Sequence, residues 1–154
     1  PNGTHVAEVE VDTETGAIEL IRYTAVDDAG RIINPLLLEG QVHGGIAQGA
    51  GQAIWEHCQY DRNAQMLTGS FMDYAVPRAD EMPFFTVGHN EVPTATNMIG
   101  AKGGGEGGTT PAPAAIANAV VHALASYGIE HIEMPLTPYR IWQALQAATG
   151  ESSR

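Results

Sequence analysis

The chain has 154 residues, of which 44% are hydrophobic and 16% are charged, a composition typical of a globular protein. Its formal net charge of −11 argues against nucleic acid and anionic membranes as partners. The single cysteine, Cys58, can form no internal disulfide and cannot hold an iron–sulfur cluster alone. It has no recognisable partner that would make it a nucleophile, so we expect a buried, inert thiol. The length fits one domain, residues 1–154, and because the chain begins at Pro1 we expect a piece of a longer protein.

A β-hairpin is predicted at the N-terminus. Residues 4–12 alternate between apolar and polar or acidic side chains, which is typical of a half-buried strand. Residues 12–16 (DTETG) have turn chemistry, and residues 17–28 are predicted to form the return strand. Asp27 and Asp28, at the end of this strand, are expected to be turn residues.

A glycine-rich helix is predicted next. Asn34 suits the N-cap and Pro35 the first helical position, and the helix is expected to run to about His57. Each glycine disfavours a helix interior by roughly 1 kcal/mol relative to alanine. A stripe of small residues would nevertheless let a ligand or another chain approach the backbone closely: Gly40, Gly44, Ala47 and Gly51. A second stripe lies on a neighbouring face: Gln41, Gln48, Gln52 and Trp55.

The middle of the chain is predicted to contain little regular structure. Residues 58–67 favour a short hairpin, residues 68–83 a loop and residues 84–92 a strand. Strands and helices therefore mix without strict alternation along the chain. We predict an α+β fold, in which a β-hairpin and a short mixed sheet pack with the glycine-rich helix and a second long helix.

That second helix is predicted over residues 109–128. Thr110 is expected to cap it, Pro111 to open it and Gly128 to close it. A last helix is predicted over residues 137–146, with Thr137 and Pro138 at its start, followed by a loose C-terminal tail.

The segment AKGGGEGGTTP, residues 101–111, places Glu106 among glycines just before the second helix. GGGEGG matches G-x-G-x-x-G, but a dinucleotide site also needs a preceding apolar strand and a later acid, and both are missing. An acid that merely starts a helix needs no such clearance, whereas a general base aimed at a bulky cofactor does. Lys102 could pair with Glu106, lie on the surface or bind a ligand oxygen.

The six histidines show no metal-binding spacing, so no metal-ligating residues are predicted. His43 lies on the glycine-rich helix. It could face the same ligand as the helix, pack against the protein or point into solvent.

Four motifs occur in order along nearly the whole chain, at residues 26–56, 68–83, 100–120 and 135–145. Together they resemble the C-terminal molybdenum-cofactor-binding segment of the molybdenum hydroxylases. This family includes xanthine dehydrogenase, aldehyde oxidase and the large subunit of aerobic carbon monoxide dehydrogenase. The pattern is most similar to the bacterial large subunits of the carbon monoxide dehydrogenase type.

The resemblance implies that Glu106 is a catalytic general base beside the molybdenum. It implies a molybdopterin cofactor, expected in the cytosine dinucleotide form, with iron–sulfur clusters and FAD on other domains or subunits. Two segments would contact this cofactor, and the residues implied are Gln41, Gly44, Gly45, Gln48, Lys102, Gly103 and Gly105. The sequence departs from the family pattern in the second glycine that follows Glu106.

The resemblance also implies partners. These are the remainder of the molybdenum-binding subunit, iron–sulfur and FAD subunits, and a small-molecule substrate, in an oligomeric complex without nucleic acid or membrane. The isolated segment is expected to be inactive, and its location cytoplasmic, with the periplasm as the alternative. Two other hypotheses stay open: a non-catalytic module that packs between subunits, and a nucleotide-binding domain.

Overall fold

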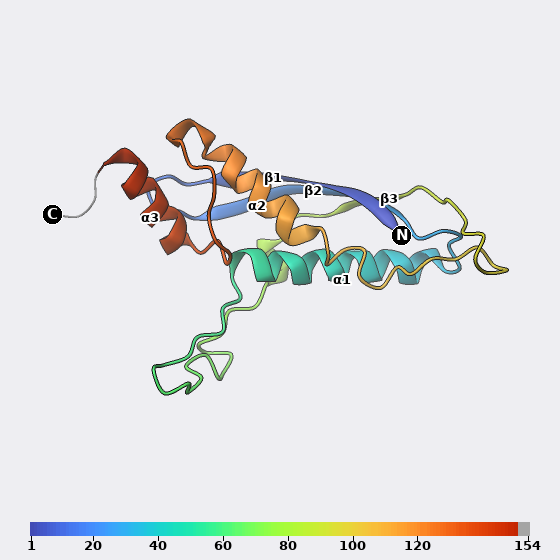
Figure 1. Cartoon of the computed structure of the whole chain (residues 1–154), viewed down its shortest axis with the longest axis horizontal. Coiled ribbons are helices and arrows are strands. Elements are labelled where there is room, and N and C mark those ends of the chain that lie inside the picture. Colours follow the sequence, from blue (N-terminus) through green and yellow to red (C-terminus); the bar gives the residue numbers. More distant parts are fainter. Residues whose placement is uncertain (151–154) are drawn as a thin grey trace.

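The computed structural model describes residues 1–150 and shows a sheet with helices packed against it (Figure 1). Strands β1 (Asn2–Val11) and β2 (Ile18–Asp28) pair antiparallel and confirm the predicted hairpin. Strand β3 (Thr86–His89) runs parallel to β2, which gives the order β1-β2-β3. The described residues therefore form the mixed sheet of the predicted α+β fold, with β3 shorter than the predicted strand.

Local signals place the starts of two helices. Helix α1 (Pro35–Ile54) begins where predicted, because the side chain of Asn34 accepts a hydrogen bond from the Leu37 amide at 3.2 Å. Helix α3 (Pro138–Thr149) begins in the same way, with Thr137 accepting from the Arg140 amide. In both helices a proline stands in the first turn, where its missing N–H costs no hydrogen bond.

Helix α2 (Ala112–Ala123) differs from the prediction at both ends. Its N-cap is Pro111 and no side chain caps it, so the predicted capping by Thr110 is wrong. The amide of Thr110 instead donates to the Glu106 carbonyl at 3.1 Å, as part of the preceding loop. The chain leaves the α-helix after Ala123 through a 3-10 turn, and Gly128 ends that turn in the left-handed conformation, at φ 73°.

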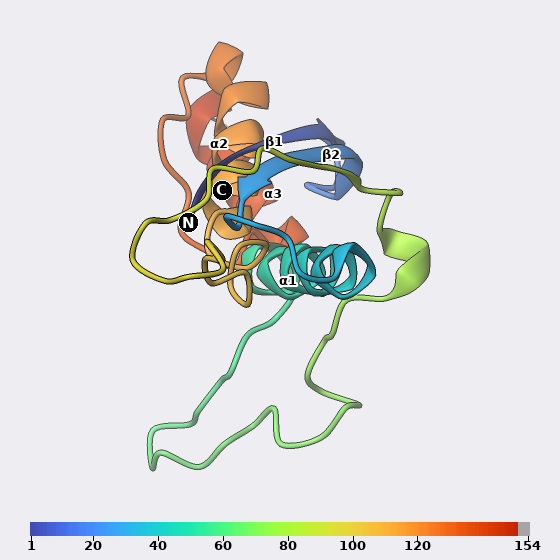
Figure 2. The same cartoon turned by 90° about the vertical axis from the view of Figure 1, so that its right-hand side faces the viewer.

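The hydrophobic core lies between the sheet and the helices. Helix α1 runs beneath the sheet, while α2 contacts both β1 and α1 (Figure 2). The largest fully buried side chains come from β2, α1, α2 and the part of the chain after α2: Tyr23, Val42, Ile46, Ile116, Val120, Leu124, Leu136 and Ile141. This burial fixes α1 and α2 relative to the end of β2.

Between Trp55 and Met82, which both pack against the hydrophobic core, the chain forms an arm that extends away from the core (Figure 2). The predicted short hairpin is present, with Tyr60 bridged to Met66. Cys58 lies at the base of this arm and is exposed, so the predicted burial of its thiol is wrong. The reason is that α1 ends at Ile54, which leaves Cys58 outside the packed part of the molecule.

No helix within residues 1–150 is both long and apolar enough to cross a membrane.

Candidate functional site

Several segments far apart in sequence meet at one end of the molecule. The ends of β2 and β3, the start of α1 and residues 90–108 lie together there, close to the N-terminus (Figure 1). A cavity of about 560 Å³ lies at this end. It is lined by Pro1, Asn2, Gly3, Asp27, Asp28, Ala29, Leu38, Val42, Gly103, Gly104, Gly105, Glu106, Gly107, Thr110 and Pro111. The glycine-rich loop, residues 100–108, therefore forms one wall of a ligand-sized space.

Glu106 lies on this wall with an exposed side chain. No side chain or amide among the described residues hydrogen-bonds to its carboxylate, and Lys102 does not pair with it. The backbone around it is nevertheless held, because its carbonyl accepts from the Thr110 amide. The carboxylate is thus available to a ligand at the edge of the cavity.

Gln41 connects α1 to the loop directly before Glu106. Its side-chain Nε2 donates to the Gly105 carbonyl at 2.8 Å, which leaves the carboxamide oxygen as an acceptor. Gln48 lies two turns further along α1 and is also exposed. The structure therefore brings Gln41, but not Gln48, into contact with the predicted base-bearing loop.

Two of the glycines allow the loop to lie directly on α1. A Cβ on Gly108 would overlap the Val42 carbonyl oxygen, and a Cβ on Gly45 would lie 2.8 Å from the Thr109 amide nitrogen. Both approaches involve backbone atoms, which cannot move aside as a flexible side chain could. Gly45 is accordingly buried beneath the loop, and its direct contact with a cofactor stays a prediction.

Other glycines of the site face open space. A Cβ on Gly44, Gly103 or Gly105 would meet nothing within 4 Å among the described residues. Gly40, at the start of the predicted small-residue stripe, is equally open, whereas Gly51 at its end packs against Pro77. The predicted clearance is therefore present at some glycines, while others serve packing within the chain.

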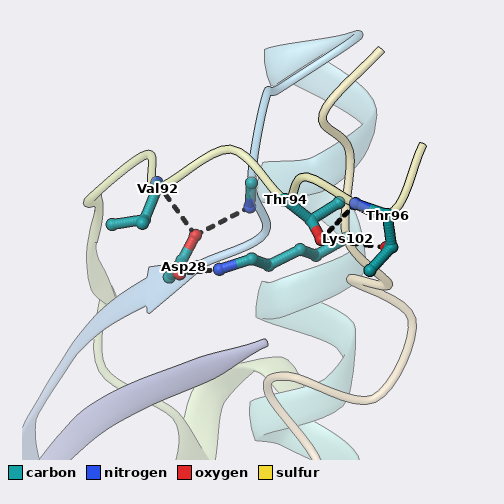
Figure 3. Close-up of polar contacts among 6 residues, drawn as sticks. Asp28, Val92, Thr94, Thr96 and Lys102 are labelled. Carbon is teal, nitrogen blue, oxygen red and sulfur yellow. Dashed lines mark hydrogen bonds and ion pairs between the residues drawn. The ribbon is translucent and has the colours of Figure 1, made fainter. Parts of the chain in front are cut away.

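Lys102 pairs with Asp28 at the end of β2. Its Nζ lies 2.5 Å from Oδ2 of Asp28 (Figure 3). The side chain of Asp28 is only 3% exposed. The other oxygen, Oδ1, accepts from the amides of Gly30 at 2.7 Å and Val92 at 3.1 Å. The hydrogen bond from Lys102, followed by that from Gly30, lowers the pKa of the Asp28 carboxyl to about 2. The prediction that Asp28 is a turn residue is wrong.

Asp27 takes part in a different buried network, so its assignment to a turn is also wrong. Its Oδ1 lies 3.1 Å from His5 Nε2, and His5 Nδ1 lies 2.9 Å from the Tyr23 hydroxyl. Burial, and secondarily the charge of Asp27, raises the pKa of Tyr23. Oδ2 of Asp27 is buried without a partner among the described residues. No local sequence signal marks this network, because it forms only when β1 pairs with β2.

His43 packs within the protein. Its ring makes a T-shaped contact with the ring of Phe85 at a centroid distance of 5.6 Å, which favours the packing alternative over contact with a ligand. Across residues 1–150, no three side chains of His, Cys, Asp or Glu gather closely enough to hold a metal ion.

Comparison with known proteins places this geometry in a family. A family model described as a molybdopterin cofactor-binding domain matches residues 1–83. The nicotine 6-hydroxylase large subunit of Paenarthrobacter nicotinovorans is 41% identical over 143 residues, which are 93% of this chain and 18% of the relative. The carbon monoxide dehydrogenase large chain of Hydrogenophaga pseudoflava is 36% identical and is matched over 95% of this chain and 18% of its own length.

Solved structures agree with this assignment. The structure of a Cu,Mo-containing CO dehydrogenase in its carbon monoxide reduced state has a TM-score of 0.92 at 34% identity, over 96% of this chain and 18% of that chain. Quinoline 2-oxidoreductase from Pseudomonas putida 86 has a TM-score of 0.89 at 41% identity, over 94% and 18% of the two chains.

The chain belongs to the molybdopterin cofactor-binding domain family and corresponds to a segment of the molybdenum-binding large subunits of molybdenum hydroxylases. The predicted resemblance is thereby confirmed. The chain spans about 18% of the length of the relatives described above.

Proposed function

We propose that this chain forms one wall of the molybdenum cofactor site in an oxidoreductase of the molybdenum hydroxylase type, with Glu106 as its general base. One observation carries the proposal. Glu106 is an exposed carboxylate without a partner among the described residues, at the edge of a cavity of about 560 Å³. The loop that carries it is held by the hydrogen bond from Gln41 and by the ion pair between Lys102 and Asp28. A carboxylate placed in this way can accept a proton from a group bound in the cavity.

The residues present fit one side of a molybdopterin. Gly44 has open space above it, so a flat ring system can approach the backbone of α1 closely. The carboxamide oxygen of Gln41 offers an acceptor to ring N–H groups, and the exposed amide of Gln48 offers a further polar contact. Gly103 and Gly105 leave the loop backbone accessible, because a Cβ at either position would meet nothing within 4 Å among the described residues. We propose that these residues hold the cofactor.

The chemistry divides between the cofactor and the chain. When bound, the cofactor would supply the redox centre for oxidative hydroxylation of a small carbon substrate. Glu106 would remove a proton at its carboxylate, while Gln41 would hold the carbonyl of Gly105, the residue directly before Glu106. Gly45 would contribute indirectly, since it lets the loop rest on α1.

The wider assembly belongs to the same proposal. We propose the cytosine dinucleotide form of the cofactor, iron–sulfur and FAD centres on other domains or subunits, an oligomeric complex and a cytoplasmic location. Release of the nucleotide tests the cytosine dinucleotide form of the cofactor: acid treatment of the purified complex should liberate CMP. Release of NAD would instead favour the nucleotide-binding hypothesis.

The catalytic assignment is tested by Glu106→Gln in the complete complex. Carbon monoxide, nicotine, xanthine, quinoline and an aldehyde serve as trial substrates, with electron transfer to a dye as the readout. With the substrate that is oxidised, we expect turnover to fall about 100-fold or more, because general bases contribute about 10²–10⁴-fold. Molybdenum content should stay unchanged.

The matched control is Glu130→Gln, the same change at an exposed glutamate outside the cavity lining. It should leave turnover unaltered. Turnover of Glu106→Gln at the wild-type rate, with molybdenum still bound, would contradict the general-base role.

A further inference from the structure

We propose that the ion pair between Lys102 and Asp28 is a positioning device for Glu106. Lys102 would act on Glu106 through the backbone of the loop, without touching its carboxylate. This inference rests on the proposed role of Glu106 as a general base. It gives Lys102 a role that the sequence did not indicate. The sequence left three other roles open: pairing with Glu106, exposure on the surface and contact with a ligand oxygen.

Asp28 joins three separate segments at one carboxylate. Oδ2 holds the Lys102 ammonium from the glycine-rich loop, while Oδ1 accepts from Gly30 after β2 and from Val92 after β3 (Figure 3). The Lys102 side chain is 20% exposed and that of Asp28 is 3% exposed, so solvent screens this pair weakly. The pair therefore ties the start of the loop to the end of the sheet.

Backbone contacts show how firmly the same point is held. The Lys102 amide donates to the Ala29 carbonyl at 2.8 Å, and the Arg31 amide donates to the Gly100 carbonyl at 2.9 Å. Between them, Gly30 and Ala101 form an antiparallel bridge. The loop thus begins as a short extension of the sheet. Backbone hydrogen bonds hold this extension, and the ion pair between Lys102 and Asp28 adds a side-chain contact to it.

Little free chain remains between this anchor and Glu106. Only Gly103, Gly104 and Gly105 intervene, and Gln41 holds the carbonyl of Gly105. A side chain on Gly104 would meet Leu38 of α1, so the middle of the stretch also lies against the helix. A displacement of Lys102 would therefore be transmitted to Glu106 over a few residues.

The ion pair is the sensitive part of this anchor. If Lys102 loses its charge, Asp28 keeps a buried carboxylate whose counter-ion is gone, and such a group is strongly unfavourable. The carboxylate must then take up a proton or admit water, and either change disturbs the hydrogen bonds to Gly30 and Val92. Removing both charges at once avoids the unpaired charge.

The test compares Lys102→Met, Lys102→Arg and the double variant Asp28→Asn/Lys102→Met in the complete complex, with the substrate that the wild type oxidises. For Lys102→Met we expect kcat to fall about tenfold or more, with KM within about twofold and molybdenum content unchanged. Lys102→Arg should recover most of kcat, and the double variant should lose less than Lys102→Met. Amide hydrogen exchange of residues 100–108 should accelerate about tenfold in Lys102→Met.

The control is Glu8→Gln, which breaks the ion pair between Glu8 and Arg22 on the exposed face of the β1–β2 hairpin. This pair has an N–O distance of 3.1 Å, but its side chains are 52% and 62% exposed. Because exposed pairs contribute little, neither kcat nor exchange in the loop should change.

The outcomes separate this proposal from the one on which it rests. Faster exchange in Lys102→Met with unchanged kcat would overturn the positioning role, and so would a rise in KM or a loss of molybdenum at unchanged kcat. If Glu106→Gln is impaired while Lys102→Met is not, only the positioning role fails. Wild-type turnover in Glu106→Gln refutes the general base and the positioning role together.

Discussion

The two glycine-rich regions of the molecule, helix α1 and the loop at residues 100–108, both contain packed and open glycines but arrange them differently. In α1, Gly45 and Gly49 pack against the chain before and at the start of α2, and Gly51 packs against Pro77, while Gly40 and Gly44 are open. In the loop, packed and open glycines follow one another along an irregular backbone. Helical periodicity groups Gly51 with Gly40 and Gly44, so it separates packed from open glycines only in part in the helix, and not at all in the loop.

The backbone angles show which glycines of the loop need an unusual conformation. Among the loop glycines, Gly100 has a positive φ, at 73°, and the others do not adopt the left-handed conformation. Gly104 and Gly108 leave no room for a side chain, whereas Gly103 and Gly105 face open space and need neither a missing side chain nor an unusual backbone angle for packing within the chain. A glycine-rich stretch beside a ligand site can therefore combine tightly packed positions, such as Gly108, with open ones, such as Gly103.

The largest effect should come from a side chain at the contact between the two regions. Gly108→Ala places a Cβ onto the Val42 carbonyl oxygen, so α1 and the loop must separate. We expect a local loss of about 1–3 kcal/mol, the usual range for overpacking, measured as faster amide exchange across α1 and the loop. Gly103→Ala makes the same change at an open position of the same loop and should leave exchange in α1 unchanged. Equal exchange in the two variants would refute the contact.

A smaller effect is expected on the open face of α1. Gly44→Leu fills the space above the helix that we assign to the cofactor, so molybdenum content of the complex should fall by more than half. Gly44→Ala provides the control, because it stabilises the helix by about 0.5–1 kcal/mol and adds only a methyl group. Normal molybdenum content in Gly44→Leu would contradict the close approach of the cofactor to α1.

The smallest effect concerns the pH dependence of the anchor at Asp28. The hydrogen bond from Lys102 lowers the pKa of this carboxyl from its ordinary value of 3.8 to about 2 in the folded protein. The stabilisation is therefore complete above about pH 4 and is lost as the pH falls from 4 towards 2. The difference in Tm between wild type and Asp28→Asn should accordingly shrink over this window.

Asp12 is the control for the pH dependence of the Tm difference. Its pKa is also lowered, chiefly by the Thr15 hydroxyl, but it lies in the hairpin turn far along β1 from the loop. Asp12→Asn should leave the acid response of Asp28 intact. A Tm difference for Asp28→Asn that stays constant from pH 5 to pH 2 would show that the carboxyl does not titrate as described.

Features that depend on neighbouring residues were predictable from the sequence. Asn34 with Pro35, and Thr137 with Pro138, mark helix starts because capping and proline geometry act within one turn. The hairpin followed from alternation and from the turn that ends at Gly16, whose φ is 75°. The family was also recognisable, because its motifs are short, ordered and locally complete.

Features that join distant segments were not predictable in this way. Lys102 and Asp28 form an ion pair although they are 74 positions apart in the sequence, and no local sequence pattern around either residue indicates its partner. The same holds for His5 and Tyr23, which meet only through the register of β1 with β2. Sequence alone therefore determined the elements, the family and the candidate base, Glu106. Only the tertiary structure decided which glycines pack, which stay open and which charges hold the loop, because long-range contacts depend on how the elements are placed in space.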